Sequence, residues 1–182
     1  VTPNMENRNG ADVSDKGIFN MPFLRFWFAF VSPLFKGVQS GDFREIEERY
    51  TNRKLEFSDL TFNQLSQELL KKSMREDAIV QIGGYWDNVV DIDILAKTAS
   101  GKLIAGTCKN SNNKIKKSEL NSLKEKCEKA GLEIETFVIV AKAGFSKELK
   151  ALKGDGLRLL TMKNFKVLLE ELDEDDLIRG FA

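Results

Sequence analysis

The sequence predicts an α/β protein with a mixed central sheet flanked by helices, preceded by an N-terminal helical segment. Three observations support this fold class. Two segments of alternating polarity surround the turn at residues 99–101, and an apolar run at residues 134–142 is typical of a buried parallel strand. Amphipathic helical stretches separate the later strands. With 182 residues, the chain is long enough for one domain and a small appendage.

Composition limits the chemistry that the chain can perform. A formal net charge of zero provides no overall attraction for nucleic acid. The sequence has no histidine, which excludes Ser–His and Cys–His catalysis and histidine-ligated metals within this chain. Cys108 and Cys127 lack metal-binding spacing and favour a reducing, cytoplasmic location. The most apolar run contains Arg25 and Pro33 and is shorter than the roughly 20 residues of a membrane span, so no membrane association is expected.

Three segments are expected along the chain: a linker or arm at residues 1–20, an aromatic helical segment at residues 21–57, and an α/β domain at residues 58–182. A start at Val1, without an initiator methionine, suggests a fragment of a longer protein. A helix beginning at Pro22 should end before Pro33. Because it is apolar nearly all round, we expect it to be buried against other parts of the protein.

The remaining elements follow from caps and periodicity. Residues 42–50 predict a short charged helix, and Ser58 or Asp59 is expected to cap a second helix that runs to residue 74. A strand at residues 78–86 precedes the hairpin. The order then continues with a helix from about Ser118 to Gly131, the strand at 134–142, a helix at 146–154, a strand at 156–162 and a terminal helix at 163–178 with an acidic end.

Charged residues in the hairpin are predicted to meet on one face. A three-residue loop with Gly101 in the left-handed conformation sets the register of the two strands. Asp93 then lies opposite Thr107, and Asp91 lies opposite Lys109, with opposed Cβ atoms about 5 Å apart. A two-residue turn would instead divide these side chains between the two faces.

This grouping has a chemical and a purely structural interpretation. Strict alternation places Asp93 with Leu95 on one face of the strand and Ile92 on the other. Neighbouring carboxylates repel, and a divalent cation or an ammonium group relieves that repulsion. In a metal-dependent site, Mg²⁺ would hold a phosphate and a water molecule while a lysine orients the water. The alternative is an Asp91–Lys109 ion pair without chemistry.

Lysines follow the hairpin closely. They are Lys114, Lys116, Lys117, Lys124, Lys126 and Lys129. On a strand end and the adjacent helix, they would form a positive rim suited to a DNA backbone. A solvated helix face, balanced by Glu119, Glu125 and Glu128, accounts for them equally well.

Five segments occur in the same order as in a known protein family: "MPFLRFWFAFVSP", "TFNQLSQELL", "YWDNVVDIDILA", "IAGTCKN" and "AGFSKEL". Over roughly residues 18–149, the chain resembles the C-terminal DUF234 domain of archaeal-type AAA+ ATPases. The hairpin resembles the Asp…(Glu/Asp)-x-Lys core of restriction-endonuclease-like, PD-(D/E)xK nucleases. The resemblance implies that fold, DNA as a partner, and preceding ATPase and winged-helix regions. The present sequence contains no P-loop motif.

The resemblance also assigns roles to hairpin residues. It implies metal binding by Asp93 and Asp91 and a catalytic role for Lys109, with Mg²⁺ or Mn²⁺ as the cofactor of an active enzyme. Thr107 stands where the second metal-binding acid is expected, and a neutral hydroxyl is a weak ligand for Mg²⁺. Asn63 replaces the helix glutamate that often completes such sites.

A carboxylate from elsewhere could compensate for these departures. Glu68 lies a little further along the same helix as Asn63. Some nucleases of this fold recruit the acid from the helix after the hairpin, where Glu119 or Glu125 would serve. A surface role for Glu119 is the alternative.

The sequence therefore predicts a DNA-binding nuclease-fold domain of a larger ATPase, with Mg²⁺-dependent phosphodiester hydrolysis weakened or absent. Whether the chain is an enzyme, a metal-dependent endonuclease, stays open. The alternative is a catalytically dead scaffold, with the helix from Phe23 to Val31 as an assembly surface or homo-oligomer contact. A metabolic α/β enzyme has little support, because "IGGYW" is too short for a dinucleotide fingerprint.

Overall fold

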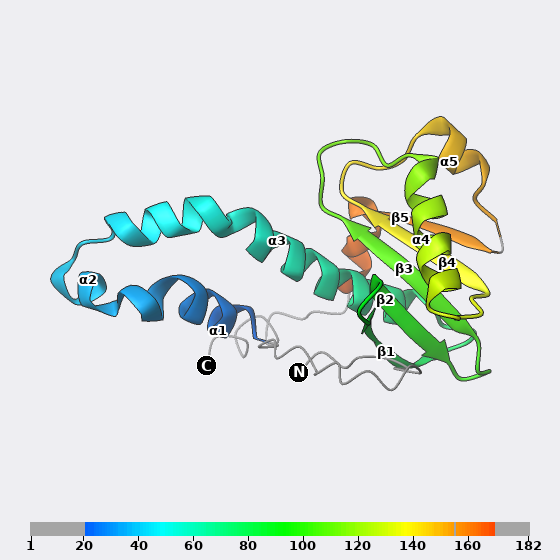
Figure 1. The fold of residues 1–182 in the computed structure, drawn as a ribbon, viewed down its shortest axis with the longest axis horizontal. Coiled ribbons are helices and arrows are strands. Elements are labelled where there is room, and N and C mark those ends of the chain that lie inside the picture. The colour runs from blue at the N-terminus through cyan, green and yellow to red at the C-terminus, as the bar shows by residue number, and fades with distance from the viewer. Residues whose placement is uncertain (1–20, 155, 170–182) are drawn as a thin grey trace.

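The computed structural model describes residues 21–154 and 156–169. The linker expected at residues 1–20, and the part of the expected terminal helix beyond residue 169, lie outside the described residues. Figure 1 shows a domain built on a five-stranded sheet, from which a pair of helical segments projects to one side. The predicted class, an α/β fold with an N-terminal helical segment, is confirmed.

The projecting part, residues 21–57, is called the arm. Its first side consists of α1 (Pro22–Phe26), the π-helix η1 (Trp27–Val31), the 3₁₀ helix η2 (Ser32–Leu34) and α2 (Phe35–Ser40). Gly41, at a φ of 75°, turns the chain into α3 (Arg44–Ser73), which forms the second side. The helical path does not end before Pro33 as expected. Pro33 lies in the first turn of η2, where its missing N–H leaves no helical hydrogen bond unmade.

Helix α3 is one continuous helix of 30 residues, where the sequence predicted two. It contains no glycine or proline. Ser58 and Asp59 lie inside this helix and so cap no new one, and their side chains instead accept hydrogen bonds from the Asn110 amide over 2.7 and 3.1 Å. The boundary expected between residues 57 and 58 falls inside α3, which extends from the arm onto the sheet (Figure 1).

Aromatic rings form the contact between the two sides of the arm. Phe30 is 1% exposed, and its ring centroid lies 5.3 Å from that of Tyr50 and 5.6 Å from that of Phe57. Arg25 is buried beside them, over the ring of Phe57. Phe23, in contrast, is 63% exposed. The expected burial against another part of the protein is present on the face that α3 covers, and the opposite face is exposed.

The sheet contains β1 (Ile79–Trp86), β2 (Asp91–Thr98), β3 (Leu103–Lys109), β4 (Thr136–Ala141) and β5 (Leu157–Thr161), in that spatial order. The first two pairings are antiparallel and the last two are parallel. The apolar run at residues 134–142 is thus a parallel strand, β4, as predicted.

The register of β2 and β3 is the one that the turn predicts. Gly101 has a φ of 89°, and the Thr98 N–H donates to the Lys102 carbonyl over 3.0 Å. Ile94 pairs with Gly106 in the same register. A three-residue loop closed by glycine therefore aligns the strands.

Strand β2 also contains a bulge that the sequence did not reveal. Gly83 of β1 pairs with Leu95, whereas Tyr85 pairs with Ile92, so β2 has one residue more than β1 over this stretch. Ile92 consequently packs in the same core as Leu95. The expected strict alternation, which put Ile92 on the opposite face, is wrong here. Asp93 lies within the bulge.

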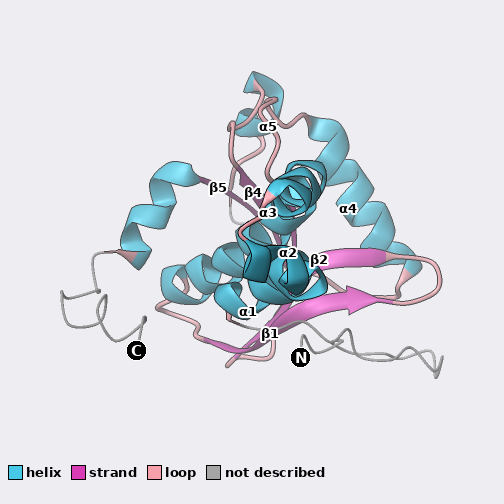
Figure 2. Cartoon of the chain, turned by 90° about the vertical axis from the view of Figure 1, so that its left-hand side faces the viewer, coloured by secondary structure: helices cyan, strands magenta, loops and turns pink. Residues whose placement is uncertain are grey.

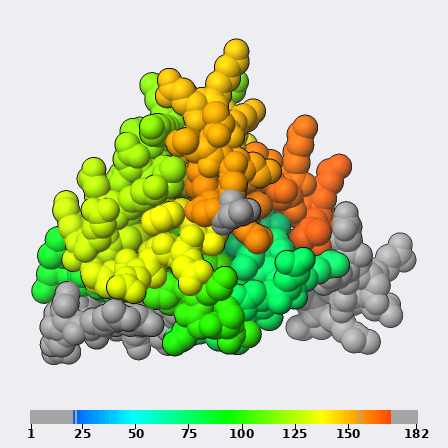
Figure 3. Space-filling view, turned by 90° about the vertical axis from the view of Figure 1, so that its right-hand side faces the viewer, coloured from blue at the N-terminus to red at the C-terminus, as the bar shows by residue number. Residues whose placement is uncertain are grey.

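Helices cover both faces of the sheet. Leu123 and Cys127 of α4 (Lys117–Lys129) pack on one face, which α5 (Lys147–Ala151) also covers. On the other face, Phe62 of α3 stacks on Phe165 of η3 (Met162–Leu168), a 3₁₀ helix where an α-helix was expected. Figure 2 shows α4 and η3 on opposite sides of the strands, and Figure 3 shows the end of the domain away from the arm. Among the described residues, no helix has the length and apolar character needed to span a membrane.

Candidate functional site

The carboxylate of Asp93 is held by two donors from the neighbouring strand. Its Oδ2 accepts the Thr107 hydroxyl over 2.8 Å and the Cys108 backbone N–H over 2.8 Å. The Asp93 carbonyl accepts a longer, 3.4 Å hydrogen bond from the Gln67 amide of α3. Burial, with a smaller contribution from the Asp93 charge, raises the pKa of the Cys108 thiol. Cys108 is therefore a neutral packing residue beside the carboxylate.

Lys109, at the end of β3, forms an ion pair with Glu119 in the first turn of α4. The Nζ to Oε2 distance is 2.8 Å, and each side chain is about one third exposed, at 35% and 37%. The adjacent helix thus does present a carboxylate to the motif lysine. At this exposure, water screens much of the attraction between the two charges.

The residues singled out from the hairpin line one small cavity of about 30 Å³. Asp91, Asp93, Thr107, Lys109 and Glu119 all contribute to its wall. This volume suits one or two water molecules or a single small cation, and it is far too small for a nucleotide. The predicted convergence of acids and lysine is therefore present in the fold.

The donor set of this cavity does not make a Mg²⁺ centre as it stands. Within residues 21–154 and 156–169, no group of three or more acidic or cysteine side chains is placed to hold a metal ion. Thr107 contributes a neutral hydroxyl that is already directed at Asp93. The Lys109 ammonium already forms an ion pair with the Glu119 carboxylate. A cation that bound Asp93 Oδ2 and Glu119 Oε2 would have to displace these partners.

The acids considered on α3 do not complete the cavity. The Asn63 side-chain oxygen accepts a 2.9 Å hydrogen bond from the Gln67 amide, and Glu68 pairs with Lys71 over 2.8 Å. Neither Asn63 nor Glu68 lines the cavity wall. Glu125 is exposed and does not line it either. Among the candidate compensating acids, only Glu119 reaches the site.

Sequence reasoning missed Gln67 and assigned Lys126 only to the lysine rim, although both side chains shape the site. Gln67 joins α3 to the backbone of Asp93, and its spacing of four residues from Asn63 was the available signal. The Lys126 ammonium donates to the Asp91 backbone carbonyl over 2.9 Å, and Lys126 also lines the cavity. Its place on the same helix face as Glu119 and Leu123 follows from helical spacing, once α4 is known to cover β2.

Three exposed lysines lie between the cavity residues Lys109 and Glu119 in the sequence. Lys114, Lys116 and Lys117 are exposed and occupy the segment between β3 and the first turn of α4. Figure 1 shows this segment as a loop at the end of the sheet that faces the arm. Their ammonium groups are accessible to an anionic ligand on this side of the domain.

The fold and site define an α/β domain with a mixed sheet and an acid-and-lysine cavity at the end of β3. The chain belongs to the DUF234 family, described as archaea bacterial proteins of unknown function, whose model matches residues 27–123, just over half of the chain. Among solved structures, the chain is similar to the crystal structure of a protein of unknown function, AF1548. The two are 23% identical with a TM-score of 0.41 over 65% of this chain and 76% of that chain. No curated protein matches the sequence.

Proposed function

We propose that this chain is a DNA-binding domain with a restriction-endonuclease-like fold, in which phosphodiester cleavage is weak or absent. One observation carries the proposal: Asp93, Thr107 and Lys109 gather at one cavity in the order of an Asp…(Glu/Asp)-x-Lys motif, but a neutral hydroxyl stands in the second acid position. The mixed sheet is consistent with the fold that the sequence resemblance implies. A site of this kind retains the scaffold of a nuclease without its full set of metal ligands.

Binding in this proposal depends on the exposed loop lysines. Lys114, Lys116 and Lys117 would contact phosphate oxygens, which carry no base identity, so binding should show little sequence preference. Each phosphate neutralised contributes a slope of about −0.9 to log K against log[salt] on duplex DNA. Three contacts therefore predict a slope of about −3.

DNA binding can be measured by fluorescence anisotropy of a labelled duplex over a range of salt concentrations. The triple variant Lys114→Glu, Lys116→Glu, Lys117→Glu should bind at least about tenfold more weakly and with a smaller salt slope. A matched control reverses the same number of exposed lysines away from the hairpin and α4: Lys36 on α2, and Lys163 and Lys166 on η3. No binding by the unmodified chain at low salt, or equal losses in both triple variants, would contradict the proposal.

Cleavage is tested separately by incubating the pure protein with DNA and Mg²⁺ or Mn²⁺. Little or no cleavage is expected, and Asp93→Ala should leave any background unchanged. Strong cleavage that disappears in Asp93→Ala would establish an active nuclease and overturn the weakened-site part of the proposal. The DNA-binding part of the proposal would still stand after that outcome.

A scaffold role is the second candidate, and the exposed aromatic side chains of the arm favour it. Phe23 is 63% exposed and Phe35 is 45% exposed. Such a surface would suit docking to the ATPase and winged-helix regions that the resemblance implies for a cytoplasmic parent protein. In that case Phe23→Ser should abolish co-purification with those regions, while Asp93→Ala should leave it intact.

A further inference from the structure

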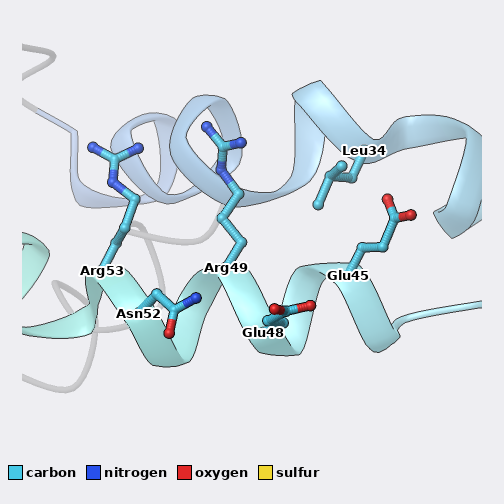
Figure 4. Close-up of a pocket in the computed structure, with 6 residues that line it drawn as sticks. All are labelled: Leu34, Glu45, Glu48, Arg49, Asn52 and Arg53. Carbon is cyan, nitrogen blue, oxygen red and sulfur yellow. The ribbon is translucent and has the colours of Figure 1, made fainter.

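The arm carries a charged groove that the proposed DNA-binding function does not use. It has a volume of about 400 Å³ and lies between α3 and the segment around Leu34 (Figure 4). Along α3, the acids Glu45 and Glu48 come first and the bases Arg49 and Arg53 follow. Figure 4 shows Glu45 toward one end of the groove and Arg53 toward the other. The groove therefore has an acidic end and a basic end.

The fold of a single chain explains only part of this pattern. Acids in the first turn of a helix interact favourably with its dipole, which accounts for Glu45. The same effect favours bases in the last turn, but α3 ends at Ser73, more than five turns beyond Arg53. Arg49 and Arg53 lie in the second and third turns of the helix, where the dipole gives a base no advantage.

Local contacts hold the two guanidinium groups at the groove without using all of their donors. Arg49 Nε donates to the Ala29 carbonyl of η1 over 2.7 Å, and Arg53 pairs with Glu56 over 3.1 Å. A guanidinium group has five N–H donors in a fixed plane, so both arginines keep donors for a further carboxylate. The basic end is therefore ordered in advance of binding.

The arm also exposes an unusual amount of aromatic surface. The exposed fractions are 63% for Phe23, 45% for Phe35, 51% for Phe43 and 43% for Tyr50. At about 200 Å² for each whole residue, this is about 400 Å² of aromatic surface. The rings of Phe23, Trp27 and Phe35 form a continuous series with centroids 6.1 and 6.3 Å apart. A stable interface buries about 800 Å² on each partner, so these rings supply at most about half of one.

We propose that two copies of this chain associate arm to arm about a two-fold axis. An antiparallel arrangement of the two α3 helices places the acidic end of each groove against the basic end of the other. Glu45 and Glu48 of one copy then face Arg49 and Arg53 of the second, and symmetry forms the same contacts twice. A purely acidic or purely basic partner would match only one end of the groove. Because the arm projects away from the sheet, the two α/β domains lie at opposite ends of this dimer (Figure 1).

Charge reversal gives a test that distinguishes lost association from lost folding. The variant Glu45→Arg, Glu48→Arg has a wholly basic groove, and the variant Arg49→Glu, Arg53→Glu has a wholly acidic one. In sedimentation equilibrium, each variant alone should self-associate with a Kd on the order of a hundredfold higher, because like charges face each other. Mixing the two variants should restore association as a mixed dimer.

Two further variants separate specific pairing from general charge or folding effects. Glu47→Arg, Lys54→Glu changes exposed charges on the arm outside the groove, and its Kd should stay within about threefold of the unmodified chain. Arg53→Glu alone keeps the Arg49–Ala29 contact and should also weaken self-association. A monomeric unmodified chain, a control as weak as the groove variants, or folded charge-reversed variants that fail to associate on mixing would each overturn the proposal.

Discussion

Thr107 and Asp93 are joined by a 2.8 Å hydrogen bond from the threonine hydroxyl to the carboxylate. The same carboxylate oxygen accepts the N–H of Cys108 over 2.8 Å, next to the point where Ile94 pairs with Gly106. The Asp93 side chain thereby accepts a backbone N–H on the neighbouring strand, as a carbonyl does within the ladder. Asp93 is consequently part of the fold as well as of the candidate site.

This relationship predicts a stability cost for removing the carboxylate. Asp93→Ala leaves the Cys108 N–H and the Thr107 hydroxyl without their acceptor, which should lower the free energy of unfolding by about 1–3 kcal/mol. Asp93→Asn keeps an acceptor oxygen and should cost less. Urea unfolding of both variants measures the difference, with Glu125→Ala as an exposed control. Equal stability of Asp93→Ala and Glu125→Ala would show that these hydrogen bonds add nothing.

Restoring the second acid should create a dependence on divalent cations. In Thr107→Glu, the new carboxylate lies beside that of Asp93, so the variant should be less stable than the unmodified protein in a chelator. At a Mg²⁺ concentration ten times the Kd, binding would stabilise the variant by about 1.4 kcal/mol, a rise in Tm of roughly 3–5 °C. Thermal unfolding with and without Mg²⁺ measures this rise, and the unmodified protein should show much less. An unchanged Tm in the variant would argue against a latent metal site.

The Lys109–Glu119 ion pair is expected to contribute little to stability. Both side chains are about one third exposed, so a double-mutant cycle with Lys109→Met and Glu119→Gln should give a coupling energy of about 0.3–1 kcal/mol. At about 1 M salt this coupling should largely disappear, because screening then acts over about 3 Å. A coupling energy that is large and insensitive to salt would show that the pair is better shielded from water than its exposure indicates.

Alkaline pH should destabilise the protein through Cys127. Burial raises the pKa of this thiol from 9.0 to about 11, so the unfolded chain ionises at a lower pH than the folded one. Its contribution is fully present below pH 9 and is lost between about pH 9 and 11, at up to about 1.4 kcal/mol per pH unit. Comparing the pH slope of urea unfolding for Cys127→Ala and the unmodified protein isolates this effect. An identical slope in both proteins would contradict it.

The sequence alone was sufficient for features set by local chemistry. Gly101 determined the hairpin register, since only a left-handed loop residue closes that turn and aligns Asp93 with Thr107. The apolar run that became β4 identified a strand buried on both faces. The meeting of Asp93, Thr107 and Lys109 at one cavity followed from the hairpin register.

Features set by long-range contacts could not be predicted in this way. The bulge around Asp93 is visible only in the pairing of β2 with β1, because no residue there carries a bulge signal of its own. Ser58 and Asp59 have typical capping chemistry, but Asn110, more than fifty residues away in sequence, takes their side-chain oxygens. The Lys109–Glu119 pair likewise depends on where α4 crosses the sheet.

The unbroken course of α3 has a mechanical consequence. At 1.5 Å per residue, its 30 residues form a rod about 45 Å long, with one end in the arm and the other on the sheet. Bending it sharply would require breaking helical hydrogen bonds, since it contains no proline or glycine hinge. Gln67 attaches this rod to Asp93 of β2, and Asp59 attaches it to Asn110, directly after β3. A load applied at the tip of the arm is therefore transmitted as a tilt to the Asp93 end of the sheet.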